Sequence, residues 1–385
     1  MSNESKYDSA FKRLEQKYKN EIGSIGKIIG KGSFGEVRDI KYKNKMMAIK
    51  ILEKDKKDKL QGEKLATNLR NHNIIKIEKI YENEKFKNIS ITNDNEYSSN
   101  SRRDMESSKS DEKNYGFIIM EKAQLKDLEK WNKLYYKYNL LKLIKLKNDD
   151  NYLFDEYIGD NLIRFYARQI INALGALYQN DYIHFDIKPE NLLVTFNLII
   201  KLTDFSLLKE IKKSDQNFKL PGGTREYITP QYYIEEKMKV DSARKQDFFA
   251  FGSSLFLLKY GLPLLKYKEY KDNQLNAERI IDLLQFNINY IKSQVFTDKE
   301  FMAFIISLIG YRPEDRADYQ KIFRNKWLNK NNEVLDKILM AFDNDEEKLI
   351  IELQKMDFLM RKEKCISQNE NNTFGKTKKF RFKKN

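Results

Sequence analysis

One run of eight residues constrains this chain more than any other part of its sequence. Residues 184–191 read His-Phe-Asp-Ile-Lys-Pro-Glu-Asn, so a carboxylate, an ammonium group and an amide lie within six positions just before a predicted strand. A carboxylate can orient and deprotonate a hydroxyl group, a lysine can offset the charge of a transferred phosphoryl group, and an amide oxygen can bind Mg²⁺. Asp204 follows Asp186 by eighteen residues, at the predicted end of a second strand, where a second Mg²⁺ ligand would lie. We expect His184, in contrast, to be a structural residue of the core.

A glycine cluster near the start of the chain is a second candidate for phosphate binding. Residues 30–35 read Gly-Lys-Gly-Ser-Phe-Gly between two predicted strands, and glycines at this spacing let backbone N–H groups approach anionic oxygens. Glycine-rich hairpins also occur without ligands, so this pattern alone is weak. A dinucleotide-binding glycine motif runs into a helix, whereas here a strand follows and ends near Lys50. That ammonium group is well placed to neutralise phosphate oxygens, although an ordinary exposed lysine would fit the same position.

Taken together, these motifs resemble the signature of the eukaryotic protein kinases, and they occur in that family's order over roughly residues 22–328. The resemblance implies an α+β bilobal protein-kinase fold, with a small β-rich N-lobe that has one main helix and a larger, mainly helical C-lobe. The predicted elements agree, because strand patterns dominate up to residue 121 and helix patterns follow from residue 124. The segment 248–260 is nearly apolar all round, which predicts a buried central helix.

The resemblance also implies roles for individual residues. Asp186 would orient the substrate hydroxyl as catalytic base, Lys188 would stabilise the moving phosphoryl group, and Lys50 would hold the α and β phosphates of ATP. Mg²⁺ would be bound by Asn191 and Asp204. The residues implied to bind the nucleotide are Gly30, Gly32, Ser33, Phe34, Gly35, Val37, Ala48, Lys50, Glu63, Met120, Glu121, Ala123 and Leu193.

The resemblance also implies that Lys50 pairs with a glutamate on the helix that follows it, which the sequence predicts over residues 54–70. Glu63 is the best candidate, because it lies nine residues before His72, where the sequence resembles the family's corner between this helix and the next strand. Glu53 is a weaker alternative, since it is too close to Lys50 in the sequence.

Two positions predict the substrate class. Lys188, two residues after Asp186, is typical of serine/threonine kinases. Residues 223–227 (Gly-Thr-Arg-Glu-Tyr) resemble the segment whose threonine hydroxyl bridges the catalytic aspartate and lysine. Tyrosine-directed members usually have other residues at both sites. We therefore predict a serine/threonine protein kinase that uses ATP and Mg²⁺ and acts on a protein substrate.

Three positions depart from the family pattern. Phe185 replaces the arginine that usually pairs with a phosphorylated activation-loop residue, which predicts activity without that phosphate and gives Ser214 no switching role. Ser206 replaces a glycine, at a cost of roughly 1–3 kcal/mol if a left-handed conformation is required. Gln231 replaces a glutamate that normally forms a buried ion pair with the equivalent of Arg316, so that cation would be less well compensated.

These departures leave a second hypothesis open, namely a pseudokinase or weakly active nucleotide-binding scaffold. Pseudokinases commonly lose the equivalent of Lys50, Asp186 or Asp204, and this chain retains all three. A third hypothesis, a nucleic-acid-binding protein, rests on charge alone: 72 Lys and Arg residues against 57 Asp and Glu residues give +15. Lysine, asparagine, isoleucine and tyrosine are abundant along the whole chain, so we do not expect nucleic acid as a partner.

Several segments are predicted to flank or interrupt the kinase domain. Residues 1–21 are predicted as an N-terminal extension, with a short helix that does not belong to the main core. Residues 83–114 are dense in Ser, Asn, Asp and Glu and are predicted as a disordered insert, and residues 131–155 as another insertion. Residues 329–385 are predicted as an extension with two amphipathic helices and a basic tail, the tail being either disordered or a nuclear-import or anionic-surface patch.

The remaining composition indicates the compartment. The single cysteine, Cys365, cannot form an internal disulfide, and the chain has no zinc-binding cysteine framework. The first residues lack the apolar core of a signal peptide, and the apolar stretches at 248–258 and 301–309 are too short to span a bilayer. We expect a protein without a membrane span, located in the cytoplasm or the nucleus.

Overall fold

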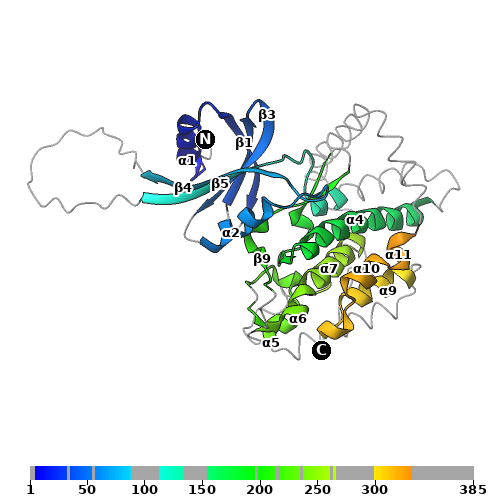
Figure 1. Ribbon diagram of the computed structural model, residues 1–385. Helices are drawn as coiled ribbons and strands as arrows, with labels where there is room; N and C mark the ends of the chain where they lie inside the picture. Colours follow the sequence, from blue (N-terminus) through cyan, green and yellow to red (C-terminus); the bar gives the residue numbers. More distant parts are fainter. Residues whose placement is uncertain are drawn as a thin grey trace, which may run out of the picture.

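The computed structural model describes residues 5–32, 35–53, 57–87, 112–133, 154–195, 198–212, 217–219, 221–234, 237–260, 263–265 and 299–330. These residues form two lobes, one built around a β-sheet and the other mainly helical, as the sequence predicted (Figure 1). The predictions for Ser33, Phe34, Ser214 and the C-terminal extension beyond residue 330 lie outside the described residues. Among the described helices, none combines the length and hydrophobicity that crossing a bilayer requires.

The N-lobe sheet has five antiparallel strands in the order β1-β2-β3-β5-β4. Its strands are β1 (Ile22–Gly32), β2 (Gly35–Tyr42), β3 (Lys45–Glu53), β4 (Ile77–Lys87) and β5 (Glu112–Met120). One helix, α2 (Lys57–Ala66), follows β3. Side chains alternate between the two faces of a strand, so Ile49 and Ile51 belong to one apolar cluster while Ala48 and Leu52 belong to the other. The intervening Lys50 therefore lies on the face that is turned toward the C-lobe.

The N-terminal segment packs against the N-lobe sheet, and its buried residues join an apolar cluster separate from the larger one that spans both lobes. Phe11 and Leu14 of helix α1 (Asp8–Lys17), together with its N-cap residue Tyr7, are buried in the same cluster as Ile49, Ile51 and Phe117 of the sheet. The rings of Phe11 and Phe117 lie 5.7 Å apart at 63°. The buried positions recur at the three- and four-residue spacing of an amphipathic helix, but they are separated by charged residues that make the segment look polar.

The predicted inserts are also shorter than expected. Strands β4 and β5 extend to Lys87 and start at Glu112, so residues 83–87 and 112–114 belong to the sheet, and only 88–111 lie outside the described residues. At the second insertion, Trp131 is 6% exposed and its Nε1 donates to Tyr166 Oη at 3.0 Å, so this residue is part of the core. Paired strands and buried aromatic contacts explain why these polar stretches are ordered at their ends.

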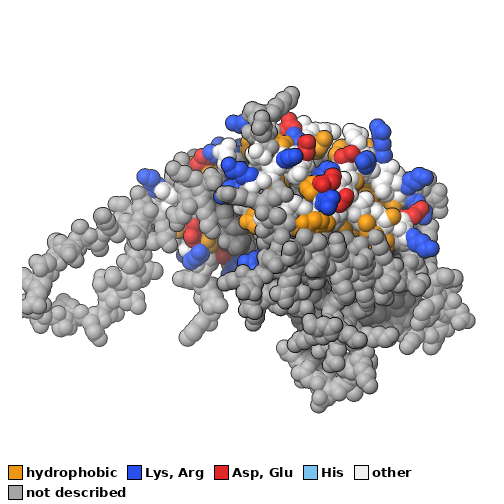
Figure 2. All heavy atoms as spheres, turned by 90° about the horizontal axis from the view of Figure 1, so that it is seen from below, with side chains coloured by type: hydrophobic (Ala, Val, Ile, Leu, Met, Phe, Trp, Pro, Cys, Tyr) orange, Lys and Arg blue, Asp and Glu red, His pale blue; other side chains and the backbone are white. Residues whose placement is uncertain are grey.

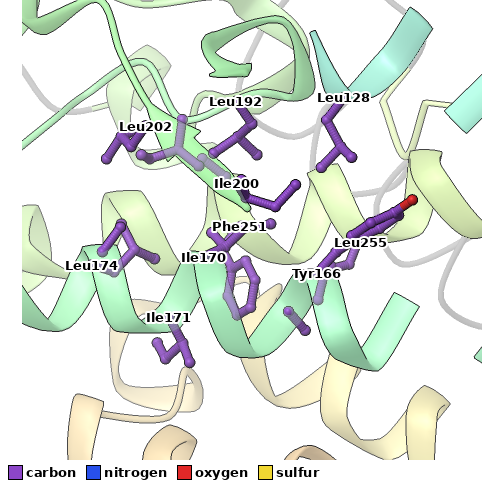
Figure 3. Close-up of a cluster of buried hydrophobic side chains, with 14 of the residues drawn as sticks. Leu128, Tyr166, Ile170, Ile171, Leu174, Leu192, Ile200, Leu202, Phe251 and Leu255 are labelled. Atoms are coloured by element: carbon purple, nitrogen blue, oxygen red, sulfur yellow. The ribbon is translucent and has the colours of Figure 1, made fainter. Parts of the chain in front are cut away.

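The C-lobe is built on α4 (Phe154–Gln179) and α7 (Gln246–Tyr260), with α9 (Lys299–Leu308), α10 (Tyr319–Phe323) and α11 (Lys326–Asn329) beside them. Helix α7 is buried, as its uniformly apolar sequence predicted. Figure 3 shows side chains of α4 and α7 meeting those of two short strands in one apolar cluster. The strands are β7 (Leu192–Val194) and β8 (Ile200–Leu202), which pair antiparallel. This cluster fixes the base from which the loop of residues 184–191 and Asp204 project.

Short elements surround that base. They are β6 (Tyr182–Ile183), η1 (Pro189–Asn191), η2 (Phe205–Leu207), β9 (Lys209–Glu210), β10 (Asn217–Phe218), η3 (Arg225–Tyr227), α5 (Gln231–Ile234), β11 (Met238–Lys239), α6 (Val240–Arg244) and η5 (Pro313–Asp315). Strand β6 pairs with β9, and β10 pairs with β11. The run 184–191 therefore lies between two anchored strands, β6 and β7.

Candidate active site

Asp186 is the most highly bonded residue of the loop between β6 and β7. Its Oδ1 atom accepts from the Thr224 hydroxyl at 2.7 Å and from the Thr224 amide at 3.2 Å. Its Oδ2 atom accepts from Lys188 Nζ at 2.7 Å and from Asn191 Nδ2 at 2.9 Å. Lys188 Nζ also donates to Thr224 Oγ1 at 2.7 Å, which closes the bridge expected from the sequence of residues 223–227. A carboxylate held by four donors has a fixed position and orientation.

Lys50 connects the sheet to the C-lobe. Its Nζ atom lies 2.8 Å from Glu63 Oε1 on α2 and 2.7 Å from Asp204 Oδ1, just after β8. The alternative partner, Glu53, instead pairs with Lys6 at 2.8 Å. The structure therefore brings together one lysine and two acids from three separate elements.

The charges of this triad depend on one another. Burial alone would lower the pKa of Lys50, but the carboxylates of Asp204 and Glu63 raise it above its ordinary value, so the ammonium group stays charged. Burial alone would raise the pKa of Asp204, but the Lys50 charge and hydrogen bonds from Lys50 and Ser206 hold it well below its ordinary value. Asp204 is therefore ionised at neutral pH, as a metal ligand has to be.

Asn191 and Asp204 provide oxygen atoms of the kind that Mg²⁺ binds. The Asn191 amide nitrogen donates to Asp186 O at 2.8 Å and to Asp186 Oδ2, so these bonds leave its oxygen unused. Lys50 contacts only Oδ1 of Asp204. Within the described residues, no cluster of three or more His, Cys, Asp or Glu side chains forms a complete metal cage. Mg²⁺ usually takes one or two carboxylates and completes its shell with water and phosphate oxygens, so this donor set fits a nucleotide-bound Mg²⁺.

The glycine cluster lies at the hairpin between β1 and β2. A Cβ atom on Gly35 would lie 1.8 Å from Ile51 O, so β2 and β3 can approach each other only with glycine here. A Cβ atom on Gly30 or Gly32 would meet no contact closer than 3.7 Å. Packing in the sheet therefore does not require those two glycines, and their role in nucleotide binding stays a prediction.

Four apolar residues predicted to surround the adenine share one cluster. Ala48 on β3 and Met120 on β5 are direct neighbours across the strands, and both belong to the apolar cluster that continues into the C-lobe. Val37 on β2 and Leu193 on β7 are partly buried against the same cluster. The structure thus gathers side chains from both lobes on the inner face of the sheet.

The segment that connects the lobes is held by Glu121. Its amide donates to Lys76 O at 2.8 Å, and its Oε1 atom lies 3.0 Å from Nζ of Lys201, a β8 residue that is only 8% exposed. The predicted adenine contacts on Glu121 and Ala123 would therefore come from a backbone fixed to both lobes. Sequence reasoning missed Lys201, and the signal it overlooked was a lysine at a strand position flanked by buried apolar residues.

Two buried side chains, Asp247 and His184, hydrogen-bond to the backbone of the loop at residues 184–186. Asp247, at the start of α7, accepts from the His184 amide at 2.8 Å and the Phe185 amide at 3.0 Å. Burial raises the pKa of Asp247 to about 7. His184 is completely buried, and its Nδ1 atom accepts from the Asp186 amide at 3.2 Å. Burial lowers the pKa of His184 to about 4, so it is neutral and structural, as predicted.

Phe185 lies in a small apolar cluster of its own. It is 2% exposed and packs with Ile183, Ile211, Met238 and Ala243. The cluster joins the loop of residues 184–191 to Ile211, to β11 and to α6.

The strain expected at Ser206 is absent. Ser206 is not among the described residues with positive φ, whereas Asp204 adopts a left-handed conformation with φ 64°. Ser206 instead lies in the 3₁₀ turn η2, 3% exposed, and hydrogen-bonds Asp204. The condition for a 1–3 kcal/mol cost is therefore not met.

Gln231 partly replaces the missing glutamate. Its Oε1 atom accepts from Arg316 Nη2, and its Nε2 atom donates to Tyr311 O. Arg316 also donates to Gly310 O at 2.7 Å, but its Nη1 atom is buried without a partner. Burial lowers the pKa of Arg316 to about 9. Arg316 is therefore hydrogen-bonded through Nε and Nη2 but not through Nη1, and its side-chain partner is a neutral amide instead of a carboxylate, so it is less well compensated, as the sequence predicted.

Comparison with known proteins identifies the same region. A family model described as a protein kinase domain matches residues 24–328. Serine/threonine-protein kinase 17A of Oryctolagus cuniculus is 27% identical over 198 residues, which are 50% of this chain and 47% of that protein. An Aurora kinase of Saccharomyces cerevisiae is 27% identical over 318 residues, 80% of this chain and 69% of that protein. Sgk1 of Homo sapiens, a serine/threonine-protein kinase, is 37% identical over 116 residues, 29% of this chain and 26% of that protein. The matches thus span less than half the length of two of these three relatives.

Proposed function

This chain belongs to the protein kinase family, and from that premise we propose that it transfers the γ-phosphate of ATP to serine or threonine hydroxyls of a protein substrate with the help of Mg²⁺. The observation that carries the proposal is the triad of Lys50, Glu63 and Asp204, with contacts of 2.8 and 2.7 Å between elements of both lobes. Such a triad places an ammonium group beside a carboxylate that is able to bind a metal. The serine/threonine kinases among the relatives support the substrate class.

The Asp186 carboxylate supports the proposed role of general base. A carboxylate has about four lone-pair positions, and Thr224, Lys188 and Asn191 already donate to them. An incoming substrate hydroxyl therefore has to replace one donor, and the Thr224 hydroxyl is chemically the same group. Asp186 would then orient the hydroxyl and accept its proton, while Lys188 remains in place to offset the charge of the moving phosphoryl group.

Lys50 and the metal ligands would position the nucleotide. Lys50 is the only predicted phosphate-binding side chain on β3, and Glu63 prevents it from turning away. Mg²⁺, held by Asn191 and Asp204, would neutralise charge on the phosphate oxygens when it is bound. Transfer of this kind depends mostly on positioning and electrostatics, and the contacts of Lys50 with Glu63 and Asp204 support that role.

We also propose that activity does not depend on a phosphorylated activation loop. Phe185 cannot form an ion pair, and the apolar cluster around it already joins the catalytic loop to Ile211 and Met238. Pairing of β10 with β11 adds backbone hydrogen bonds to the same segment. Treatment with phosphatase after expression in bacteria tests this proposal, and loss of activity after that treatment would contradict it.

The proposed activity is tested by incubating the purified protein with Mg²⁺-ATP and a degenerate peptide library. Wild type should phosphorylate serine and threonine peptides, and Asp204→Ala should not. Lys133→Ala serves as the control, because this exposed lysine pairs with its helix neighbour Glu129 and with no acidic side chain of the site. ATP binding without any transfer in wild type would instead support the alternative, a pseudokinase that acts as a nucleotide-binding scaffold.

The protein substrate and the location in the cytoplasm or nucleus are parts of the same proposal. A nucleic-acid partner is not expected, and on the described part of the face in Figure 2 lysine and arginine side chains lie among aspartate and glutamate side chains. A mixed surface of this kind gives less attraction for a polyanion than a continuous basic stripe.

A further inference from the structure

Gly62 lies on α2, one residue before Glu63, where the helix meets the backbone that follows Asp204. A Cβ atom at this position would lie 2.0 Å from Phe205 O and 3.0 Å from Leu208 O. Both of these oxygen atoms belong to the main chain, so a change of rotamer could not relieve the overlap. Any side chain at position 62 therefore requires α2 and residues 205–208 to move apart.

This separation would affect Glu63 directly. The Glu63 carboxylate lies 2.8 Å from Lys50 Nζ and also accepts the Phe205 amide hydrogen. Gly62 and Glu63 are consecutive residues of one helix, so a shift that frees Phe205 O also moves Glu63. Lys50 would keep its contact with Asp204 and lose the partner that holds it from the other side.

We propose that Gly62 is a positioning residue, whose missing side chain lets α2 approach residues 205–208 closely enough for Glu63 to hold Lys50 in its phosphate-binding position. The inference rests on the proposed kinase function, because it assigns Gly62 a role in that reaction. Local structure gives no other reason for glycine here, since glycine in a helix interior is less favourable than alanine by about 1 kcal/mol. Helix propensity alone therefore predicts that Gly62→Ala stabilises the protein, whereas the contact with Phe205 predicts a loss of activity.

The experiment compares wild type with Gly62→Ala and with Gln61→Ala, a change at the neighbouring exposed position of α2. We expect kcat of Gly62→Ala to fall by about 10²-fold, the scale of a misplaced reacting group, with an unchanged KM for the peptide. Gln61→Ala should behave as wild type. Amide hydrogen exchange in residues 205–208 should accelerate in Gly62→Ala alone, while exchange in the buried helix α7 stays unchanged.

Two results would overturn the inference. The first is a Gly62→Ala variant with the kcat and the exchange at 205–208 of wild type, which would mean that the contact relaxes without moving Glu63. The second is faster exchange throughout α7, which would mean that the side chain disturbs the whole fold and that Gly62 has only a structural role. Hydrogen exchange requires no turnover, so an inactive wild type would refute the kinase function and still leave the displacement of α2 measurable.

Discussion

Introducing the family's usual arginine at position 185 is expected to damage this protein. Phe185 is 2% exposed and packs with Ile183, Ile211 and Met238. Removal of a buried aromatic side chain costs about 3–5 kcal/mol. A guanidinium group confined to the same apolar space adds a desolvation cost of several kcal/mol. Phe185→Arg should therefore lower the free energy of unfolding by at least about 4 kcal/mol, a large part of the roughly 5–15 kcal/mol that holds a typical domain.

Urea unfolding of wild type, Phe185→Arg and Phe185→Leu measures this effect. Leucine keeps an apolar side chain in the cluster, so Phe185→Leu should lose clearly less stability than Phe185→Arg. Activity before and after phosphatase treatment completes the assay, and neither wild type nor Phe185→Leu should respond to that treatment.

An arginine variant as stable as wild type would refute the reasoning, because the cluster would then accept a charge without penalty. The reasoning would also be refuted if the arginine variant became more active than wild type only after phosphorylation of its activation loop. That result would mean that a phosphate can lie beside position 185 and that the apolar cluster is not what orders the segment.

Three further predictions follow from the same structure. Phe11→Ala should lower the free energy of unfolding, measured in urea, by about 3–5 kcal/mol. Lys12→Ala, at the exposed neighbouring position, should change it little, and equal effects of the two substitutions would contradict the packing of α1 on the sheet. Ser206→Gly should change kcat by less than about tenfold, because the left-handed residue of this turn is Asp204, and a larger gain in a kinase assay would mean that serine strains the turn. Burial lowers the pKa of His184 from its ordinary value of 6.5 to about 4, so between these pH values its side chain binds a proton in the unfolded chain but not in the folded one. The contribution of His184 to stability should therefore fall with decreasing pH by up to about 1.4 kcal/mol per unit, while the raised pKa of Asp247 acts in the opposite direction. The free energy of unfolding, measured by denaturation at each pH, should depend less steeply on pH in His184→Gln than in wild type between pH 4 and 6.5. An equal dependence on pH in the two proteins would contradict the lowered pKa of His184.

The chemistry of the site could be predicted from the sequence because it depends on residue types at short spacings. The run 184–191 places its acid, its lysine and its amide on one loop, so folding that loop brings them together. The buried helix α7 could be predicted over residues 248–260 for a similar reason, since a segment apolar on every side has to avoid water. Glu63 followed from its distance to the next recognisable corner in the chain.

Other features depended on contacts between residues far apart in the sequence. Helix α1 is amphipathic in any fold, but only the sheet determines that Phe11 meets Phe117 and that the segment becomes part of the N-lobe. Residues 84–87 of β4 and 112–115 of β5 are mostly polar, and they are held in the sheet by backbone pairing. Backbone pairing carries no sequence signature, so it could not be predicted. Nothing within helix α2 requires glycine at position 62. The requirement arises only from the packing of α2 against the main chain at Phe205, where a side chain at position 62 would overlap the carbonyl oxygen. Local sequence determines which groups are available and how each segment prefers to fold, while close packing between segments determines which of those groups come within bonding distance.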